Sequence, residues 1–233
     1  VISELLFHPP AEGSDYIEIY NRSNKVINLA ELSISSRNSA LQIQSAISLS
    51  KYPELLLPGE YRVFTIDTTW LLARYGYKGE ESMRILPSLP SWPDKTGWAV
   101  LLGAQQQVID QLNYDEKMHY ALLSSFEAVA LERVNLSALS DQIAQWYSAS
   151  STSNYGTPGY ENSQQYKSNI SSQAFFIDVK RLSPNHDGHE DFLTIRYSLS
   201  EPGWMAQIFI FDAAGRTVRI LQPQTLLGTS GSI

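Results

Sequence analysis

Metal-ligating and acid-base side chains are concentrated in one stretch near the end of the chain, SPNHDGHEDF, from Ser183 to Phe192. Carboxylate and carboxamide oxygens are the hard ligands that calcium prefers, and Asn185, Asp187 and Asp191 supply them. Gly188 can bend the chain sharply between them. A calcium loop that also uses backbone carbonyls is therefore one hypothesis for this stretch.

Two more specific metal sites fit the same stretch poorly. An EF-hand register puts Ser183 at the first ligand position and Thr194 at the last, where that motif needs acids. His186 and His189 are imidazoles of the kind that zinc and other transition metals bind. Two histidines three residues apart, without a defined third ligand, are weak evidence for a zinc site.

A plain turn is the competing interpretation of SPNHDGHEDF, and we favour it. In such a turn, Asn185 and Asp187 accept hydrogen bonds from nearby backbone amides. Pro184 fixes the entry into the turn, and Gly188 takes a positive φ. The calcium loop stays open as the alternative.

Other acidic and basic side chains do not combine into a catalytic set. Asp15 and Glu18 are an odd number of residues apart in a strand-like run, so they point to opposite faces and we interpret them as structural. His119 lies among apolar residues and is expected to be packed, with Asp115 and Glu116 as the acids that could orient it.

Familiar catalytic motifs are absent from the sequence. It contains no G-x-S-x-G nucleophile elbow, no H-E-x-x-H zinc helix and no G-x-x-x-x-G-K-[ST] phosphate loop. We therefore predict no catalytic residues, no cofactor beyond the calcium just considered, and a protein that is not an enzyme. A calcium-dependent enzyme built on the Asp187 and Asp191 loop ranks last, because one loop does not make an active site.

Composition and charge limit the partners. The chain has 233 residues, with 17 Lys and Arg against 24 Asp and Glu, a formal net charge of -7, which argues against a nucleic-acid partner. There is no cysteine, which removes disulfides and zinc-thiolate sites. The longest apolar runs fall far short of the roughly 20 residues that span a bilayer, so no membrane insertion is expected. The opening VISELLF lacks a basic leader region, and we expect a mature or trimmed fragment.

Short alternating apolar runs, bounded by Gly, Pro, Asn, Asp or Ser, predict an all-β protein built as a sandwich or barrel. In the first part of the chain they are residues 2–7, 16–20, 26–29, 32–36, 61–66, 98–102, 108–114 and 128–134. One helix is predicted in DTTWLLARYG, with Asp67 or Thr68 as its N-cap and Gly76 at its end. A second helical turn is expected near residues 139–145.

The chain divides into two predicted units. The apolar pattern fades around residues 156–174, where Ser, Asn, Gln and Gly dominate, and we place a linker at residues 164–173. Strands resume at 175–179, 192–199, 205–211 and 217–221, with a turn at DAAGR. The 60 residues from 174 to 233 are short of the ~100 of an immunoglobulin-like domain, so this second sandwich is predicted to be incomplete.

Aromatic side chains make up 11% of the chain. Trp70, Trp92 and Trp146 lie beside predicted loops, where a ring could stack on a sugar or fill a pocket on a protein partner. Core filling explains most of the rings, and Trp92 in SWPDKTG is the one we predict to be exposed.

Residues 1–163 resemble the lamin tail domain as it occurs in bacterial proteins. The resemblance rests on an ordered set of segments: SELLFHPP, GSDYIEIYNRS, LLLPGEYRVFT, SLPSWPDKTGWAVLL, QVIDQLNYDEKMHYALL, ALERV and WYSASSTSNYGTPGYENS. It implies an immunoglobulin-like β-sandwich in which GSDYIEIYN is structural and Asn21 makes a turn with Ser23.

Residues 174–233 are similar to the immunoglobulin-like domain of flagellar hook-capping proteins. The similarity is carried by LSPNHDGHEDFLTIRYSLSEPG and IFIFDAAGRTVRIL. In that family the fold continues through a glycine-rich turn into a further strand, whereas this sequence ends at LLGTSGSI, so the similarity covers part of a module.

Together these resemblances imply a binding or architectural protein. We expect a non-enzymatic exported module for adhesion, docking or scaffolding, located outside the cell, at its surface or in the periplasm. Its partner would be a protein or a glycan, bound by strand-edge pairing or by aromatic loop contacts. The alternative is an accessory binding domain of a larger secreted hydrolase, whose catalytic part lies outside this sequence.

Overall fold

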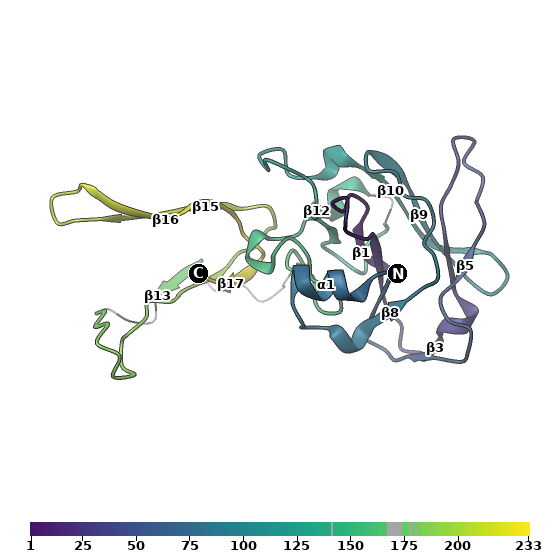
Figure 1. The fold of residues 1–233 in the computed structure, drawn as a ribbon, viewed down its shortest axis with the longest axis horizontal. Helices are drawn as coiled ribbons and strands as arrows, with labels where there is room; N and C mark the ends of the chain where they lie inside the picture. Colours follow the sequence, from purple (N-terminus) through teal and green to yellow (C-terminus); the bar gives the residue numbers. More distant parts are fainter. Residues whose placement is uncertain (141, 167–173, 178, 180) are drawn as a thin grey trace.

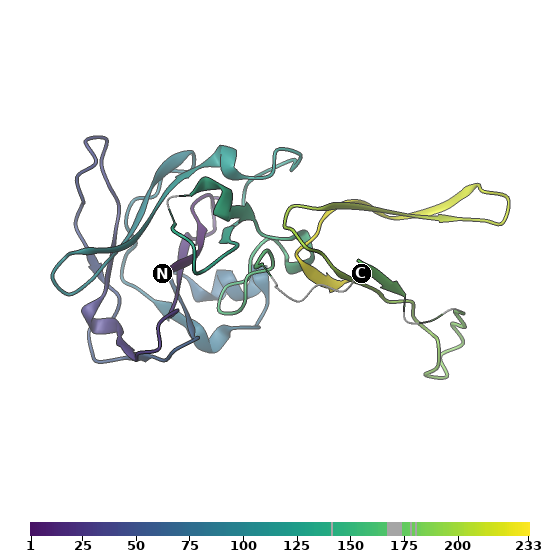
Figure 2. The same cartoon turned by 180° about the vertical axis from the view of Figure 1, so that it is seen from behind.

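A computed structural model describes residues 1–140, 142–166, 174–177, 179 and 181–233 of the chain. Figure 1 shows two units joined side by side, the first coloured purple to teal and the second green to yellow. Figure 2 shows the same arrangement from behind. The described residues form an all-β protein, which confirms the predicted fold class.

The first unit contains twelve of the strands. These strands are β1 (Ile2–Leu6), β2 (Tyr16–Tyr20), β3 (Ile27–Asn28), β4 (Ser33–Ser35), β5 (Ile47–Ser48), β6 (Leu55–Leu56), β7 (Tyr61–Thr65), β8 (Met83–Ile85), β9 (Thr96–Leu102), β10 (Val108–Asp115), β11 (Leu131–Arg133) and β12 (Trp146–Ser148). The helices are α1 (Thr68–Tyr75) and the short 3-10 turns η1 (Leu29–Glu31), η2 (Glu80–Ser82), η3 (Glu116–Met118), η4 (Ile143–Gln145) and η5 (Ser151–Ser153).

Two sheets of this unit pack face to face. One has the strand order β12-β11-β1-β2-β7-β8 and the other β10-β9-β4-β5. The main core lies between them, where apolar side chains such as Leu5, Ile17 and Phe64 meet Ile34 and Leu101, all of them almost wholly buried. Alternation along each strand sends every second side chain into this core, as the sequence pattern predicts.

The six-stranded sheet is covered on its outer face as well. A second buried cluster there joins Leu6 and Val63 of the sheet to Leu71 and Tyr75 of α1. Consequently all five residues of β1 are buried, whichever face they point to. The polar side chains on this face therefore have to find hydrogen-bond partners inside the protein.

Local capping explains where α1 begins and ends. The Asp67 side chain accepts a hydrogen bond from the Trp70 amide at 3.0 Å, which satisfies a donor of the first turn. Gly76 ends the helix with a φ of 90°, in the region that favours glycine. The predicted helix is thus confirmed with Asp67 as its cap, and the turn expected near residues 139–145 is η4.

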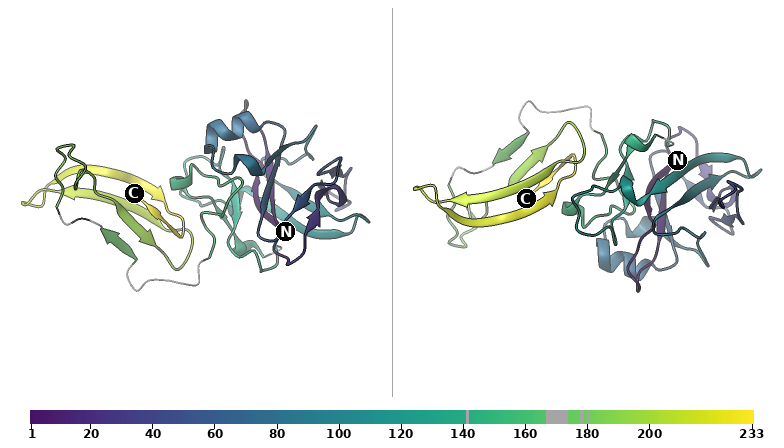
Figure 3. Two further views of the ribbon diagram at one scale, coloured as in Figure 1. Left: turned by 90° about the horizontal axis from the view of Figure 1, so that it is seen from below. Right: turned by 90° about the horizontal axis from the view of Figure 1, so that it is seen from above.

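The second unit has five strands in two small sheets. They are β13 (Phe175–Ile177), β14 (Ile195–Ser198), β15 (Met205–Phe211), β16 (Thr217–Leu226) and β17 (Ser230–Ser232). One sheet has the order β13-β14-β17, and the other is the β15-β16 hairpin, seen as a long ribbon in Figure 3. Its buried core is small, with Tyr197, Leu199 and Leu227 at the centre.

Hydrogen bonds join the two units. The amide of Thr229 donates to the carbonyl of Ser163 at 2.8 Å, and the Gln164 side chain donates to the carbonyl of Leu227 at 3.1 Å. A Cβ on Gly228 would lie 2.5 Å from that same Ser163 carbonyl, so the backbones approach as closely as they can. Gln164 opens the predicted linker and is fully buried at this joint, while residues 167–173 of the linker lie outside the described residues.

No helix in the described part of the chain is long and apolar enough to span a membrane.

Candidate functional site

The SPNHDGHEDF loop connects β13 to β14 and is closed by its own side chains. Both carboxylate oxygens of Asp191 accept backbone amides, from His186 at 2.7 Å and Gly188 at 2.8 Å. The Asp187 carboxylate accepts from the His189 amide at 2.8 Å and from the Asn185 side chain at 2.8 Å. These contacts are those of a side-chain-stabilised turn.

The same loop shows the backbone conformation that the turn hypothesis requires. Gly188 has a φ of 87°, and the Asn185 side chain accepts a hydrogen bond from the Asp187 amide at 3.2 Å. The hydrogen bond from the Asn185 side chain, followed by that from the His189 amide, lowers the pKa of Asp187. Within the described residues, no group of three or more His, Asp or Glu side chains is arranged to hold a metal ion. Calcium binding by Asn185, Asp187 and Asp191 remains a prediction.

Asp15 and Glu18 have different surroundings in the structure. Asp15 precedes β2, and its pKa is raised to about 7, first by burial and then by the neighbouring Asp94. Glu18 lies inside β2 and is fully buried. The turn expected from Asn21 is present, because its side-chain oxygen accepts from both the amide and the hydroxyl of Ser23.

Three glutamates meet on neighbouring strands of the six-stranded sheet. In the strand register Glu4 of β1 pairs with Glu132 of β11 on one side and with Glu18 of β2 on the other. All three are fully buried. Directly opposed side chains lie about 5 Å apart at Cβ, and like charges at that distance repel. We call Glu4, Glu18 and Glu132 the glutamate row.

The segment of residues 157–164 covers the glutamate row and supplies most of its hydrogen bonds. Thr157 donates its amide to Glu4 at 2.9 Å, and Gly159 donates its amide to Glu18 at 2.6 Å. Glu132 accepts the Ser163 hydroxyl and the Gln164 amide, both at 2.8 Å. The carboxylates therefore tie the end of the first unit onto its central strands.

Strand side chains complete this network. The Tyr16 hydroxyl donates to Glu4 at 2.8 Å, and the Ser3 hydroxyl donates to Glu18 at 2.6 Å. Asn162 lies in the same segment and donates its side-chain amide to the Ser3 carbonyl at 2.9 Å. Each carboxylate oxygen of the row thus has at least one hydrogen-bonding contact, as burial requires.

Burial and mutual repulsion raise the pKa values of the glutamate row. Burial raises the pKa of Glu4 well above its ordinary value, and the neighbouring carboxylates of Glu132 and Glu18 raise it further. Burial raises the pKa of Glu18 to about 8, against the hydrogen bonds from Ser3 and Gly159. Burial also raises the pKa of Glu132. Burial therefore favours the protonated form of each carboxyl group in the row.

His119 is packed, as predicted, but its partner differs from the one expected. It stacks between Phe7 and Phe126, and its Nδ1 lies 3.0 Å from the Ser148 hydroxyl rather than near Asp115 or Glu116. The loop does not fold back, because Asp115 caps η3 instead.

A serine hydrogen-bonded to a histidine can act as a nucleophile, but this pair is buried away from solvent. Ser148 is 2% exposed and His119 is 3% exposed. Burial lowers the pKa of His119 to about 4, and its Nε2 has no hydrogen-bond partner among the described residues. A substrate cannot reach this pair, so it supports no proposal of catalysis.

The prediction for Trp92 was wrong. Trp92 is 4% exposed and its side chain belongs to the main core. The Tyr114 hydroxyl donates to the Pro93 carbonyl at 3.0 Å, which ties the SWPDKTG loop to β10. Trp146 is also buried, whereas Trp204, which the sequence reading passed over, is 52% exposed. The exposed tryptophan therefore belongs to the second unit.

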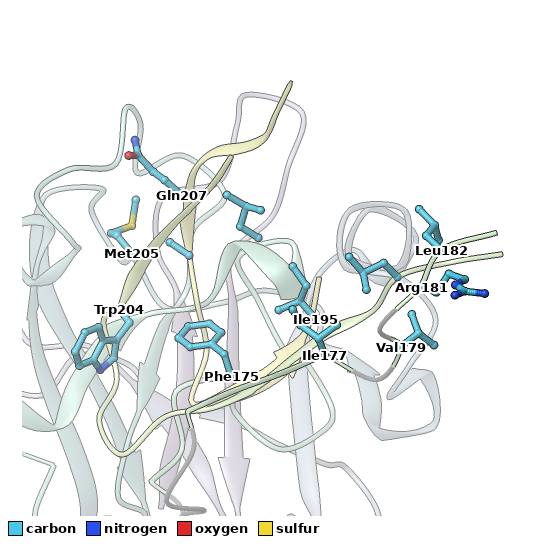
Figure 4. Close-up of a pocket in the computed structure, with 12 residues that line it drawn as sticks. Phe175, Ile177, Val179, Arg181, Leu182, Ile195, Trp204, Met205 and Gln207 are labelled. Carbon is cyan, nitrogen blue, oxygen red and sulfur yellow. The ribbon is translucent and has the colours of Figure 1, made fainter. Parts of the chain in front are cut away.

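Trp204 lies in an apolar cleft between the two sheets of the second unit. The cleft has a volume of about 1050 Å³ and is lined mainly by β13, β14 and β15. Figure 4 shows Phe175 and Trp204 toward one end, with Val179, Arg181 and Leu182 at the other. We call this the open cleft.

Large apolar side chains of the open cleft face solvent. Ile177 is 60% exposed and Phe175 is 45% exposed, although both belong to a strand. In a finished sandwich, side chains on the inner faces of both sheets interdigitate and exclude water. Among the described residues, this cleft thus has the apolar lining of a sandwich core, but its side chains are exposed.

Strand edges border the open cleft. In the described part of the chain, β13 is paired with β14 alone and β15 with β16 alone. Each therefore has one edge whose amides and carbonyls face away from any described strand. An incoming extended segment could pair with such an edge while placing alternate side chains in the cleft.

Comparisons of the chain with protein-family models, with curated proteins and with solved structures found no match.

Sequence reasoning singled out the exposed loop and missed both the glutamate row and the open cleft. The sequence does contain a sign of the glutamate row, because Glu4 and Glu132 interrupt the apolar runs SELLF and ALERV, where a charged residue is unusual. The sign of the open cleft was weaker, namely the prediction that the second sandwich is incomplete.

Proposed function

We propose that this chain is a non-catalytic docking module of an exported or cell-surface protein, and that its second unit binds an extended apolar segment of a protein partner. The observation that carries the proposal is the open cleft, where core-type side chains of two sheets face solvent beside strand edges that no described strand pairs with. Pairing with an edge would supply affinity, and the cleft would select the side chains.

The chemistry of the lining supports a protein strand over a glycan as the occupant. Phe175, Ile177, Ile195 and Met205 offer no hydrogen-bonding side chains for sugar hydroxyls. A strand that alternates apolar and polar residues would bury its apolar side chains against them and leave the others in water. Arg181 at the end of the cleft adds a cation that suits an acidic residue at that end of the bound segment.

The first unit then acts as the platform that holds the cleft. Its lamin-tail-like identity, the immunoglobulin-like topology of both units and its extracellular setting are part of the same proposal, and they rest on the sequence resemblances. The hydrogen bonds of Ser163 and Gln164 to the second unit support the view that the two units present one binding surface.

The test is selection of binding segments from a displayed library of random peptides of ten residues or so. Selected peptides are expected to alternate apolar and polar residues, to fit the two-residue period of a strand. The Ile177→Lys variant, which puts a charge into the open cleft, should weaken their binding by at least about tenfold. Hydrogen exchange should show new protection of the β15 amides on binding.

The matched control is Ile143→Lys, because Ile143 is similarly exposed, at 68% against 60% for Ile177, but lies in η4 of the first unit. It should leave peptide binding unchanged. Peptides without apolar alternation, or peptides that bind the Ile177→Lys variant as tightly, would count against the proposal. A chain that dimerises until Ile177 is replaced would also overturn it, by making a second copy the occupant.

A further inference from the structure

A second cavity lies where the two units meet, and it is polar. It has a volume of about 380 Å³ and is separate in its lining from the open cleft. Lys78 comes from the turn after α1, Tyr160, Glu161 and Asn162 come from the segment over the glutamate row, and Ser232 comes from β17. Both units are therefore needed to form it. We call it the junction cavity.

Asn162 gives the first sign of a ligand. Its side chain is 2% exposed, and its amide nitrogen donates to the carbonyls of Ser3 and Arg133 at 2.9 and 3.0 Å. Its carboxamide oxygen is buried and has no hydrogen-bond partner among the residues that the structure describes. Buried acceptors are normally satisfied, so this oxygen calls for a donor that the described chain does not supply.

The charged side chains of the cavity give the second sign. The Lys78 ammonium lies 3.9 Å from the centre of the Tyr160 ring, a cation-π contact that fixes the cation at the wall. Glu161 brings a carboxylate into the same lining. One positive and one negative side chain balance each other, so the cavity favours a neutral ligand that both donates and accepts hydrogen bonds.

The wall of the junction cavity is held in place before any ligand arrives. Thr157 and Ser163 belong to its lining, and their hydroxyls are bound to Glu132 at 2.7 and 2.8 Å. Side chains fixed in this way lose little freedom when a ligand binds. The cavity volume falls within the range of small-molecule sites in proteins, about 300–1,000 Å³.

We propose that the junction cavity binds a neutral polyhydroxylated ligand, one or two sugar rings in size. Ligand hydroxyls would donate to the Asn162 carboxamide oxygen and to Glu161, and ligand oxygens would accept from Lys78. The C–H groups of a sugar ring would pack against Tyr160, whose ring is apolar apart from its hydroxyl. The proposal does not depend on the open cleft, because the two cavities share no lining residue.

The test uses the chain of residues 1–233 and three disaccharide probes, cellobiose, maltose and N,N′-diacetylchitobiose. Saturation-transfer NMR and titration calorimetry should detect at least one of them, with a dissociation constant in the millimolar range or below. Binding should shift the side-chain amide signals of Asn162, which report the carboxamide without replacing it. Lys78→Ala and Glu161→Gln should each weaken binding by about tenfold or more, as loss of a hydrogen bond to a charged group does.

Matched controls replace the same residue types away from the cavity, with Lys117→Ala and Glu116→Gln in η3. These variants should bind the probes like the unmodified chain. Ile177→Lys should also leave sugar binding intact, so that failure of the docking proposal and failure of this one can be told apart. The inference is overturned if no probe binds, if the two control variants weaken binding as much, or if Asn162 proves to be satisfied by an ordered water alone.

Discussion

The carboxylates of Glu4 and Glu132 share one hydroxyl, that of Thr157, whose Oγ1 lies 3.2 Å from the first and 2.7 Å from the second. A hydroxyl has one proton and can donate to only one of them. The longer contact becomes a hydrogen bond if Glu4 carries a proton and donates it to Thr157. This geometry agrees with the strongly raised pKa of Glu4.

Replacing Glu4 by glutamine is therefore expected to preserve the fold. The new amide nitrogen would donate to the Thr157 hydroxyl, and the remaining oxygen would still accept from the Tyr16 hydroxyl and the Thr157 amide. We expect a change of less than about 1 kcal/mol in the free energy of unfolding at neutral pH, because every hydrogen bond is retained. Urea denaturation at pH 7 measures it.

Glu132→Gln is the matched comparison and should behave differently. Both oxygens of Glu132 accept hydrogen bonds, one from Thr157 and the other from Ser163 and the Gln164 amide. An amide nitrogen at either position would face a donor, which leaves buried groups unpaired at a cost of about 1–3 kcal/mol each. Equal stability of the two variants would show that the proton is not held at Glu4.

The glutamate row should also make the protein lose stability as the pH rises. The folded state keeps the pKa of Glu18 at about 8, whereas an unfolded chain has it near its ordinary value of 4.5. The contribution of this raised pKa to the free energy of unfolding is fully present below about pH 4.5. It is lost progressively up to about pH 8, at about 1.4 kcal/mol per pH unit for each such group.

Denaturation midpoints measured from pH 5 to 9 test this dependence, since the Glu18 contribution should make stability fall up to about pH 8. In Glu4→Gln the fall should be shallower, because one titrating group has been removed. A stability that stays flat or rises with pH would mean that the row is ionised and held by its hydrogen bonds alone.

A buried ion pair between the two sheets of the first unit, from Arg133 in β11 to Asp110 in β10, gives a further prediction. Arg133 donates to Asp110 at 2.8 Å, and the Ile2 amide donates to the same carboxylate oxygen at 2.8 Å. Asp110→Ala should lower the free energy of unfolding by about 3 kcal/mol or more, because it leaves the Arg133 cation buried without this partner. Chemical denaturation measures the loss.

The control for that experiment is an ion pair on the protein surface. Arg216 and Asp212 lie 2.7 Å apart, but Arg216 is 82% exposed. Arg216→Ala should change stability by less than about 1 kcal/mol, in keeping with exposed pairs in general. Similar losses in the two variants would contradict the role assigned to burial.

Calcium is expected to leave the melting temperature unchanged. The oxygens of Asp191 are both bound to backbone amides, and Asp187 is held by Asn185 and His189, so the loop closes without an ion. Binding would instead stabilise the folded state by about 2.7 kcal/mol at 100 times the dissociation constant. A rise in the melting temperature that disappears in Asp187→Ala would establish the calcium site.

Much of the fold could be predicted from local signals in the sequence. The alternation of YIEIY and the Asp67 and Gly76 signals around the helix are set by neighbours in the chain, so β2 and α1 were predicted with nearly correct ends. The expected strand at residues 217–221 extends to Leu226, because pairing with β15 carries it past Pro223. That extension depends on a partner strand and cannot be read from the segment itself.

The polar sites depend on contacts between distant segments, which a single sequence does not reveal. Glu18 and Glu132 are 114 residues apart, and only the strand order β11-β1-β2 places them on either side of Glu4. The burial of Trp92 has the same cause, since a loop closes over the core only when both sheets are in place. Conversely, the loop at Asn185 was interpretable because its hydrogen bonds are local.

The hydrogen bond between Thr229 and Ser163 connects the second unit to the buried glutamates of the first. Thr229 precedes β17, and the Ser163 hydroxyl donates to Glu132 of β11, the strand between β12 and β1. A force that pulled the two units apart would therefore act on Glu132, at the β11 end of the glutamate row, through the bonds that Ser163 makes.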